Sequence, residues 1–548
     1  MKIPENKLYL ILIILIVIAS ATALFGDLME PDGALYAAIA KTMVLKNDWI
    51  NLYLHDADWL DKPHLTFWLA AASYKIFGIS AFAYKLPSFL AGLLGCWYLY
   101  LFTKAIYDQK TALISVLIFS TALHLIISSF DVRAETYITA FVIASIYHYY
   151  RAHQQSFWHI VAGSFFAACA IMIKGIFVLI PVFAGFLIYW VVSRQYKEIL
   201  KPKWWIALVL ILIFISPELY ALYVQFDLHP EKIVFGQQGV SGLRFFFWDS
   251  QFGRFFNSGP IKGKGDVSFF LHTTLWAFLP WSILFYTAIA QLVKKKNRDK
   301  IPMEGIIIWA SALVSFLIFS LSKFQLPHYI LLIFPQFSIL TAAYLCRLES
   351  TGIKVFFKIQ NVLFLLITVL LSSVALLFHV PSPFLCIGSL LFLLILAFVL
   401  FKGTSVQTIM ARSTFLSISL MGFLYLFFYP ALLEYQAGMK AGKWLQEQHP
   451  GTPAKVLMNS SDAFDFYAPG EVGYLSGYEA LEKEKKDKGM VLYVPEAEFS
   501  VLKTMYHTQI LKSFDYFHIT RLKAKFLNYQ TRRQVLERFY LVKIHQRN

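Results

Sequence analysis

The stretch GDLMEPDGALYAAIAKTM, residues 26–43, follows the first apolar run and places Asp27, Glu30 and Asp32 at the mouth of a hydrophobic segment. A charged side chain costs roughly 3 kcal/mol or more at the centre of a bilayer, so charges at the end of a membrane helix suggest function. Pro31 favours a helix start, which would place Asp32 in the first turn. There the backbone N–H groups favour the ionised carboxylate.

The composition is that of a membrane protein. The chain has 548 residues, of which 58% are hydrophobic and only 15% charged, with a mean hydropathy of +0.58. Soluble proteins carry roughly 25% charged residues. The net charge of +16 comes from Lys and Arg that lie mostly between apolar runs. That pattern indicates membrane topology and gives no reason to expect a nucleic-acid partner.

Runs of about 18 or more apolar residues are long enough to cross the hydrocarbon core. Thirteen candidates occur, at residues 8–25, 83–106, 110–130, 132–151, 158–173, 176–193, 204–226, 267–292, 303–321, 328–346, 355–378, 382–402 and 411–432. The first is either a cleaved signal peptide or a retained anchor, and its length favours the anchor. We therefore predict an all-α polytopic bundle of about thirteen transmembrane helices.

Basic residues gather in alternate loops, which places the N-terminus in the cytoplasm. This basic set consists of Lys2, Lys7, Lys104, Lys110, Arg151, Arg194, Lys197, Lys201, Lys203, KKKNRDK (294–300), Arg347, Lys354, Lys402 and Arg412. The loops 26–82 and 227–266 then face outward, as does the C-terminus. Residues 1–432 form the predicted transmembrane domain. After residue 432 short β-branched runs alternate with helical patterns, which predicts a small soluble α/β domain over residues 433–548.

The polar residues near the predicted helix ends all lie on the outer side. They are Glu30, Asp32, Asp61, Lys62, Asp131, Arg133, Glu135, Lys174, Glu218, Arg254, Lys262, Lys264, Lys323 and His328. An ion-coupled transporter would scatter such groups around the midplane. A one-sided cluster of carboxylates and cations suits a different chemistry, in which a carboxylate acts as a general base and cations stabilise a phosphate leaving group.

Several motifs occur in an order typical of one family. EPDGALYAAIAKTMVLKNDWI is followed by WLDKPHLTFWL, DVRAETYITAF, MIKGIFVLIP, FLPWS and SLSKFQLPHYILLIFP. Over roughly residues 5–345 the chain resembles the polyprenyl-phosphate-sugar glycosyltransferases of the GT-C fold. The similarity is to the aminoarabinose-to-lipid A transferases and the protein O-mannosyltransferases.

The resemblance assigns roles by motif. It implies that Asp32 is the catalytic Asp, with Glu135 in the place of a second family Asp. It implies that Lys62 contacts the donor phosphate, and it adds Arg254, Lys323 and Lys174 as further phosphate ligands. The supporting residues are Asp61, Arg133, Glu30, His328 and Tyr329.

The chain departs from the family pattern at two points. Gly33 stands where the family usually has Glu, and the family's His before the eighth span, part of a metal site in some members, is missing around IKGKGD. Asp61 alone is a poor ligand set for zinc. The residues therefore indicate no certain cofactor, although a divalent metal stays open.

We therefore expect an integral-membrane glycosyltransferase of the bacterial inner membrane, with a periplasmic C-terminal domain. It would move a sugar from a polyprenyl-phosphate donor to an outer-facing lipid, glycan or protein acceptor, with Asp32 as general base. Two other hypotheses stay open. One is a polyprenyl-lipid or polysaccharide transporter whose cations bind a cargo phosphate. The other is a scaffold that acts through its outer domain.

For each candidate residue a structural alternative also stays open. Asp32 alternatively caps its helix. Glu135 and Arg133 alternatively form a purely structural ion pair, and Lys174 and Lys323 alternatively extend to the interface as lysines at helix ends do. Glu218 belongs to no certain motif, and a buried, paired carboxyl is an equally good interpretation.

Overall fold

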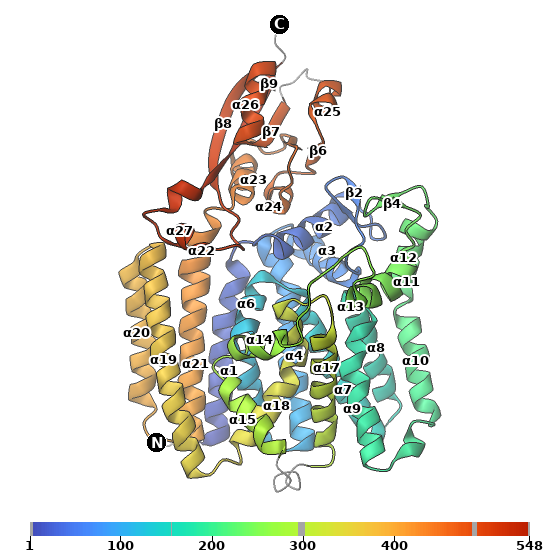
Figure 1. Ribbon diagram of the computed structural model, residues 1–548, viewed down its shortest axis with the longest axis vertical. Helices are drawn as coiled ribbons and strands as arrows, with labels where there is room; N and C mark the ends of the chain where they lie inside the picture. The colour runs from blue at the N-terminus through green and yellow to red at the C-terminus, as the bar shows by residue number, and fades with distance from the viewer. Residues whose placement is uncertain (1–3, 155, 294–301, 485–489, 546–548) are drawn as a thin grey trace.

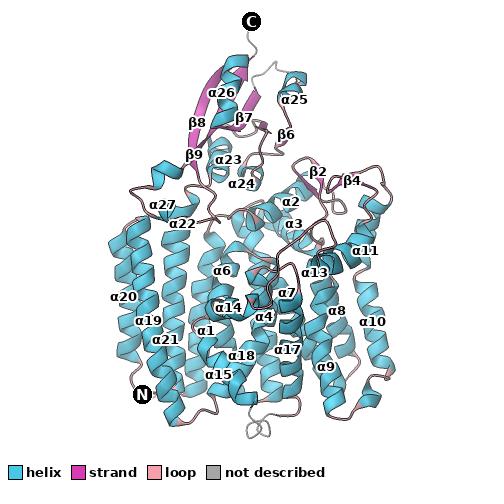
Figure 2. Cartoon of the chain, in the orientation of Figure 1, coloured by secondary structure: helices cyan, strands magenta, loops and turns pink. Residues whose placement is uncertain are grey.

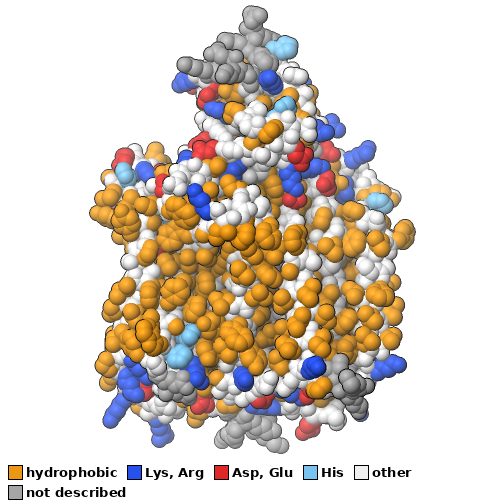
Figure 3. Space-filling view, turned by 180° about the vertical axis from the view of Figure 1, so that it is seen from behind, with side chains coloured by type: hydrophobic (Ala, Val, Ile, Leu, Met, Phe, Trp, Pro, Cys, Tyr) orange, Lys and Arg blue, Asp and Glu red, His pale blue; other side chains and the backbone are white. Residues whose placement is uncertain are grey.

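A computed structural model shows a helical bundle with a smaller domain on one end (Figure 1). The structure describes residues 4–154, 156–293, 302–484 and 490–545, so the basic KKKNRDK segment lies outside the described residues. We call the end of the bundle that carries the C-terminal domain the domain side. The N-terminus lies at the opposite end. On the face shown in Figure 3 a broad hydrophobic band covers the bundle, with charged side chains above and below it.

The thirteen expected apolar runs each fall on one to three helical elements. Six helices among the described residues are long and apolar enough to cross a membrane, and eight spans result if each of two bent pairs counts as one. The single helical segments are α1 (Glu5–Ala21), α4 (Ala81–Ile106), α7 (Ala134–Gln154), α8 (Trp158–Lys174), α9 (Leu179–Val192), α17 (Gly305–Leu321), α18 (Phe334–Leu345), α19 (Ser350–Phe378), α20 (Pro383–Leu400) and α21 (Val406–Gly422). The all-α membrane bundle is confirmed.

Three of the runs are broken. The pair α5 (Gln109–Ser120) and α6 (Leu123–Asp131) bends by 58°, and the pair α10 (Pro202–Phe214) and α11 (Ser216–Leu222) bends by 41°. The second bend precedes Pro217, which lacks the N–H that a continuous helix needs. The run 267–292 divides at Pro280 into α14 (Phe269–Ala277) and α15 (Ser282–Val293) for the same reason.

Two helices fill the first loop, between the bundle and the C-terminal domain. They are α2 (Asp32–Lys46) and α3 (Leu65–Phe77), joined through a hairpin of β1 (Tyr53–Leu54) and β2 (Ala57–Asp58). Small residues on α2, including Ala34, Ala37 and Ala40, are fully buried and permit close packing of the helix on its neighbours. Asp32 therefore stands at the start of a rigid element.

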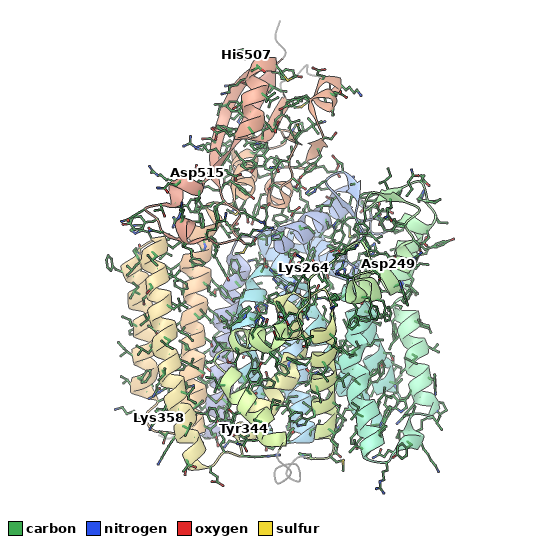
Figure 4. The ribbon with its side chains drawn as sticks, in the orientation of Figure 1. Asp249, Lys264, Tyr344, Lys358, His507 and Asp515 are labelled. Carbon is green, nitrogen blue, oxygen red and sulfur yellow. The ribbon has the colours of Figure 1, made fainter. Side chains whose placement is uncertain are left out.

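The second loop contains another hairpin and short helices. It runs through β3 (Ile233–Val234), β4 (Gln237–Gln238), α12 (Gly242–Arg244), the helical segment η5 (Phe245–Gly253) and α13 (Arg254–Phe256). Asp249 and Lys264, labelled in Figure 4, mark this loop on the domain side, whereas Tyr344 and Lys358 lie toward the other end.

The C-terminal domain has a five-stranded mixed sheet, and the predicted small α/β domain is confirmed as part of the fold class. The strand order is β6-β5-β7-β9-β8, with β6, β5 and β7 parallel and β9 antiparallel to both β7 and β8. The strands are β5 (Ala454–Leu457), β6 (Gly473–Leu475), β7 (Met490–Pro495), β8 (His507–Tyr516) and β9 (Glu537–His545), and the helices are α23 (Ala437–Gln448), α24 (Asp462–Tyr467), α25 (Tyr478–Lys483) and α26 (Glu496–Met505). Figure 2 shows these strands above the bundle.

Candidate active site

Asp32 begins α2 and is held by one cation. Its Oδ2 atom accepts a hydrogen bond from Arg133 Nη1 at 2.7 Å. The other oxygen, Oδ1, has no hydrogen-bond partner among the described residues, and 34% of the side chain is exposed. The N–H groups of the first helical turn add a favourable field for the negative charge. Asp32 is thus an oriented carboxylate with an oxygen available to another molecule.

Arg133 joins three groups from different parts of the chain. It lies between α6 and α7, next to Val132, which adopts a left-handed backbone conformation. Its Nη2 atom is 2.8 Å from Asp131 Oδ2, and its Nη1 atom is 3.1 Å from His328 Nδ1. Asp131, which sequence analysis placed near the site without a role, therefore shares Arg133 with Asp32.

The contact between Arg133 and His328 fixes the tautomer of the histidine. A guanidinium group only donates hydrogen bonds, so His328 Nδ1 acts as the acceptor. The ring then carries its proton on Nε2, which lies 3.8 Å from Glu135 Oε1. Arg133 and His328 thereby connect the carboxylates of Asp32 and Glu135.

Glu135 forms an ion pair with Lys174 across two helices. Glu135 lies in the first turn of α7 and is 3% exposed, and Lys174 is the last residue of α8. The Lys174 ammonium also lies over the Tyr329 ring, 3.7 Å from its centroid. A cation over an aromatic face is attracted by the ring quadrupole. These three predicted site residues, remote in sequence, lie together.

Asp61 holds two further cations. Its Oδ2 atom is 2.5 Å from Lys62 Nζ, and its Oδ1 atom pairs with Arg254 from the second loop. Burial alone would raise the pKa of Asp61, but the charges of Lys62 and Arg254 outweigh it and lower that pKa to about 2. The carboxylate therefore stays ionised and holds both cations at one wall of the site.

These side chains line a cavity of about 110 Å³. Its charged lining consists of Lys62, Lys174, Arg254, Asp61 and Glu135, so the lining carries one more positive than negative charge. The remaining wall is largely apolar and includes Ile138, Phe177, Val178, Ile318, Phe319 and Leu332. A cationic end joined to an apolar wall matches an anionic head group on a lipid chain.

Five predicted residues do not line this cavity: Asp32, Arg133 and His328, which are joined to it through Glu135, and Lys323 and Glu30. Lys323 is exposed and does not line it; its backbone N–H donates to the Phe255 carbonyl at 3.0 Å. Glu30 contacts the C-terminal domain, where its Oε1 atom accepts hydrogen bonds from Ser461 Oγ and the Ala463 N–H, both at 2.8 Å.

Tyr36 and Gln251 are two further residues at the site to which the sequence motifs assigned no role. Tyr36 lies one turn after Asp32 on α2. Burial raises the pKa of its hydroxyl well above the ordinary value, and the charges of Asp32, Asp61 and Glu135 act in the same direction. The spacing of four residues from Asp32 was the available signal. Tyr36 therefore lies among the site carboxylates.

Gln251 lines the cavity and donates to the Lys174 carbonyl at 3.1 Å. This contact explains the glycine that follows Lys174. Gly175 has a φ of +92°, and a Cβ there would lie 2.1 Å from Gln251 Nε2. Only glycine tolerates both the positive φ and the close approach of Gln251. No sequence pattern pointed to Gln251, because it lies in an aromatic loop segment.

Glu218 and His64 form a buried pair apart from the cavity. The Glu218 side chain accepts from the His64 backbone N–H at 2.9 Å and lies 3.0 Å from His64 Nδ1. Both side chains are fully buried. The pair ties α11 to the segment before α3, which is a structural role.

Among the described residues no group of three or more His, Cys, Asp or Glu side chains is arranged to hold a metal ion. Asp61, the carboxylate that the family resemblance would place at such a site, is bonded instead by two cations.

Comparisons with known proteins agree on one fold and one group of relatives. The family model described as dolichyl-phosphate-mannose-protein mannosyltransferase matches residues 61–220. An uncharacterized protein of Aquifex aeolicus is 27% identical over 382 residues, which cover 68% of this chain and 69% of that protein. The undecaprenyl phosphate-α-4-amino-4-deoxy-L-arabinose arabinosyl transferase of Shewanella sediminis is 27% identical over 56% of this chain and 53% of that protein.

The chain spans a little over half the length of the arabinosyl transferases that it matches. The structural likeness is longer. The crystal structure of ArnT from Cupriavidus metallidurans bound to undecaprenyl phosphate aligns with a TM-score of 0.74 at 16% identity, over 98% of this chain and 97% of that one. The GT-C fold and the resemblance to the aminoarabinose transferases are therefore confirmed, and the chain is a multi-pass membrane protein.

Proposed function

We propose that this protein is an integral-membrane glycosyltransferase that moves a sugar from a polyprenyl-phosphate donor to a lipid, glycan or protein acceptor. The observation that carries the proposal is the cavity in which three cations and an apolar wall lie next to the Asp32 network. A transporter of the same lipid would need the cations alone. The oriented carboxylate with a free oxygen favours chemistry on the acceptor.

The donor phosphate would occupy the cationic end of the cavity. Lys62 and Arg254 pair with the two oxygens of Asp61, and Lys174, which lines the same cavity, pairs with Glu135. Each cation is held by a carboxylate, and a phosphate offers the same kind of oxygen partner. Lys323 would add a weaker contact from the exposed rim. The polyprenyl chain would lie along the apolar helix faces and extend into the membrane.

In the proposed reaction Asp32 takes the proton of an acceptor hydroxyl or amine. The nucleophile forms a bond to the anomeric carbon of the sugar, and the bond from that carbon to the phosphate oxygen breaks. The electron pair stays on the polyprenyl phosphate, whose charge Lys62, Arg254 and Lys174 stabilise. A single displacement of this kind inverts the configuration. Arg133 orients Asp32, and Glu135 assists through Lys174 and His328.

The proposed orientation follows from the loop charges. Basic residues in the loops opposite the domain side support a cytoplasmic position for that end, in a bacterial inner membrane. The domain side and the C-terminal domain would then be periplasmic. Because the related transferases are named for undecaprenyl phosphate-α-4-amino-4-deoxy-L-arabinose, that compound is the first donor to test.

The decisive experiment uses purified protein in liposomes, with that donor and a bacterial envelope extract as the source of acceptor. We expect Asp32→Asn to lower transfer by roughly 10²–10⁴-fold, the usual contribution of a general base, while binding of undecaprenyl phosphate is retained. Glu231→Gln is the control, because Glu231 is an exposed carboxylate on the same side whose side chain is 68% accessible.

Undiminished transfer by Asp32→Asn would defeat the assignment. Mass spectrometry of lipid A and envelope glycans from a strain without the gene, beside its parent, identifies the sugar and the acceptor. A strain with an unchanged envelope but altered distribution of polyprenyl lipids would favour the transporter.

A further inference from the structure

The C-terminal domain contains a second cavity, larger than the cationic one. Its volume is about 360 Å³, which lies in the range of roughly 300–1,000 Å³ typical of small-molecule sites. One sheet face supplies an aromatic wall through Tyr493 of β7, Tyr516 of β8 and Phe539 of β9. The Phe539 ring centroid lies 5.1 Å from that of Tyr493 and 5.0 Å from that of Tyr516.

The edge of the cavity is polar. Glu537 is the direct strand partner of Tyr516, so both side chains stand on the same sheet face. Asn459, Ser460 and His518 complete the rim. Within the part of the chain that the structure describes, the side chains of these residues have no hydrogen-bond partner. Groups of this kind are available to a ligand, because nothing in the protein competes for them.

Glu30 forms the floor of the cavity toward the bundle. Its Oε1 atom is occupied by Ser461 and the Ala463 N–H. Its Oε2 atom has no partner among the described residues. Burial raises the pKa of Glu30, so the protein bears a cost for placing a carboxyl there. Such groups are common in binding sites.

The lining selects a class of ligand. Aromatic faces attract the C–H edges of other rings, and carboxylates accept hydrogen bonds from hydroxyl and amine groups. Among the described lining residues none is Lys or Arg, whereas two are Glu. This charge disfavours a phosphate and favours a neutral or amine-bearing ligand. A saccharide ring presents both an apolar face and a polar edge.

The cavity also adjoins the proposed catalytic residue. Glu30 and Asp32 are two residues apart, so their Cα atoms lie at most about 7.6 Å from each other. Arg133 and His328 connect Asp32 to Glu135, which lines the cationic cavity. Asp32 is therefore connected to a site suited to a phosphate and is two residues from Glu30, which lines a site suited to a sugar.

We propose that this second cavity binds a phosphate-free sugar residue of the acceptor, either neutral or amine-bearing, and presents the acceptor to Asp32. That the bound sugar belongs to the acceptor of the reaction rests on the proposed function. Binding of the sugar itself is independent of transfer. An experiment on binding therefore distinguishes failure of this inference from failure of the proposed function.

The test measures binding to the full-length protein in nanodiscs by saturation-transfer NMR. The probes are the β-linked glucosamine dimer, its N,N′-diacetylated form and glucosamine 6-phosphate. We expect both disaccharides to bind more tightly than the phosphate. Glu537→Gln and Tyr516→Ala should each weaken disaccharide binding by roughly tenfold, which corresponds to about 1.4 kcal/mol, and should leave undecaprenyl phosphate binding unchanged.

Asp515→Asn is the matched control. Asp515 is adjacent to Tyr516 on β8 (Figure 4), but it stands on the opposite sheet face and is half exposed. Its variant should bind both disaccharides normally. Thermal unfolding of each variant checks that the domain is folded. Tighter binding of the phosphate, or equal disaccharide binding by Glu537→Gln, Tyr516→Ala and the control, would overturn the inference. In Asp32→Asn, sugar binding should persist without transfer.

Discussion

Two lysines on the domain side, the partly buried Lys174 and the buried Lys41, have opposite kinds of partner. In the cationic cavity Lys174 pairs with the Glu135 carboxylate and lies over the Tyr329 ring. Beneath the C-terminal domain Lys41 of α2 donates to three backbone carbonyls, those of Asp465 and Ala468 at 2.6 Å and that of Phe466 at 3.2 Å. Both ammonium groups are largely removed from water, yet only that of Lys174 can exchange its protein partner for a ligand.

The partner decides the role. A carboxylate that holds a cation can be replaced by a phosphate, because both offer anionic oxygens. Among the described residues these carbonyls, at and just after the end of α24, accept from no other donor, so Lys41 acts as a C-terminal cap that fastens the domain to α2. Removal of a cavity cation should therefore impair binding and transfer, whereas removal of Lys41 should impair stability.

The largest expected effect is on transfer. We predict that Arg254→Ala lowers the transfer rate by roughly 10²–10³-fold, as the loss of one electrostatic stabiliser usually does, and weakens undecaprenyl phosphate binding. Lys62→Ala should behave alike. Arg244→Ala is the control, because this arginine does not line the cavity and its side chain is 75% accessible. An unchanged transfer rate of Arg254→Ala and Lys62→Ala in liposomes would contradict the idea that the donor phosphate replaces Asp61 as the partner of these cations.

The second prediction concerns stability. Lys41→Met should lower the free energy of unfolding by on the order of 3 kcal/mol, because it leaves buried carbonyls without donors. Thermal denaturation in detergent measures the effect. Lys46→Met, in the exposed last turn of the same helix, should unfold near the wild-type temperature. If Lys41→Met kept its stability but lost phosphate binding, the contrast between the two lysines would fail.

The third prediction is a pH dependence of the same interface. His55 Nε2 lies 3.0 Å from Asp462 Oδ1 and 3.3 Å from Asp465 Oδ2, close to Glu30, Tyr474 and Lys41. Burial, helped by the charge of Asp462, raises the pKa of Asp465 to about 7, although His55, Tyr474 and Lys41 act in the opposite direction. Burial alone would lower the pKa of His55, but its bond to Asp462 and the charge of Asp465 raise it above 6.5.

Both groups therefore bind a proton more tightly in the folded state. Their contribution to stability is present at low pH and is lost as the pH rises, over roughly pH 4–7 for Asp465 and above that for His55. We expect the thermal unfolding temperature of the wild type to fall between about pH 5 and about pH 8. Asp465→Asn should flatten the dependence. Stability that rises over this interval would show that the cluster titrates in the opposite sense.

Part of the fold was predictable from the sequence. Apolar runs long enough to span a bilayer predicted the helices, because hydrophobic length is a local property. The bends before Pro217 and at Pro280 had a local signal in proline. The docking of α24 on α2 had none, because it depends on Lys41 reaching backbone carbonyls more than 400 residues away.

The candidate site was predictable where side-chain chemistry sufficed. The family motifs carried Asp32, Lys62, Glu135 and Lys174, which the structure places in two ion-pair networks that meet at one cavity. The partners of these side chains were not predictable. No sequence pattern indicates that Arg133 donates to both Asp32 and His328, or that Gln251 occupies the space next to Gly175. Such contacts arise only when helices remote in sequence pack side by side.

The smallest predicted effect belongs to Lys323. Its motif suggests a phosphate contact, but its side chain is exposed and outside the cavity lining. Exposed charge pairs are screened by water and contribute about 0–1 kcal/mol. Lys323→Ala should therefore weaken undecaprenyl phosphate binding by roughly fivefold or less, far below the effect of Arg254→Ala, and more so at low salt than at high salt. A loss as large as that of Arg254→Ala would mean that bound lipid draws Lys323 inward, and that burial among apolar helices is no requirement for a strong phosphate ligand here.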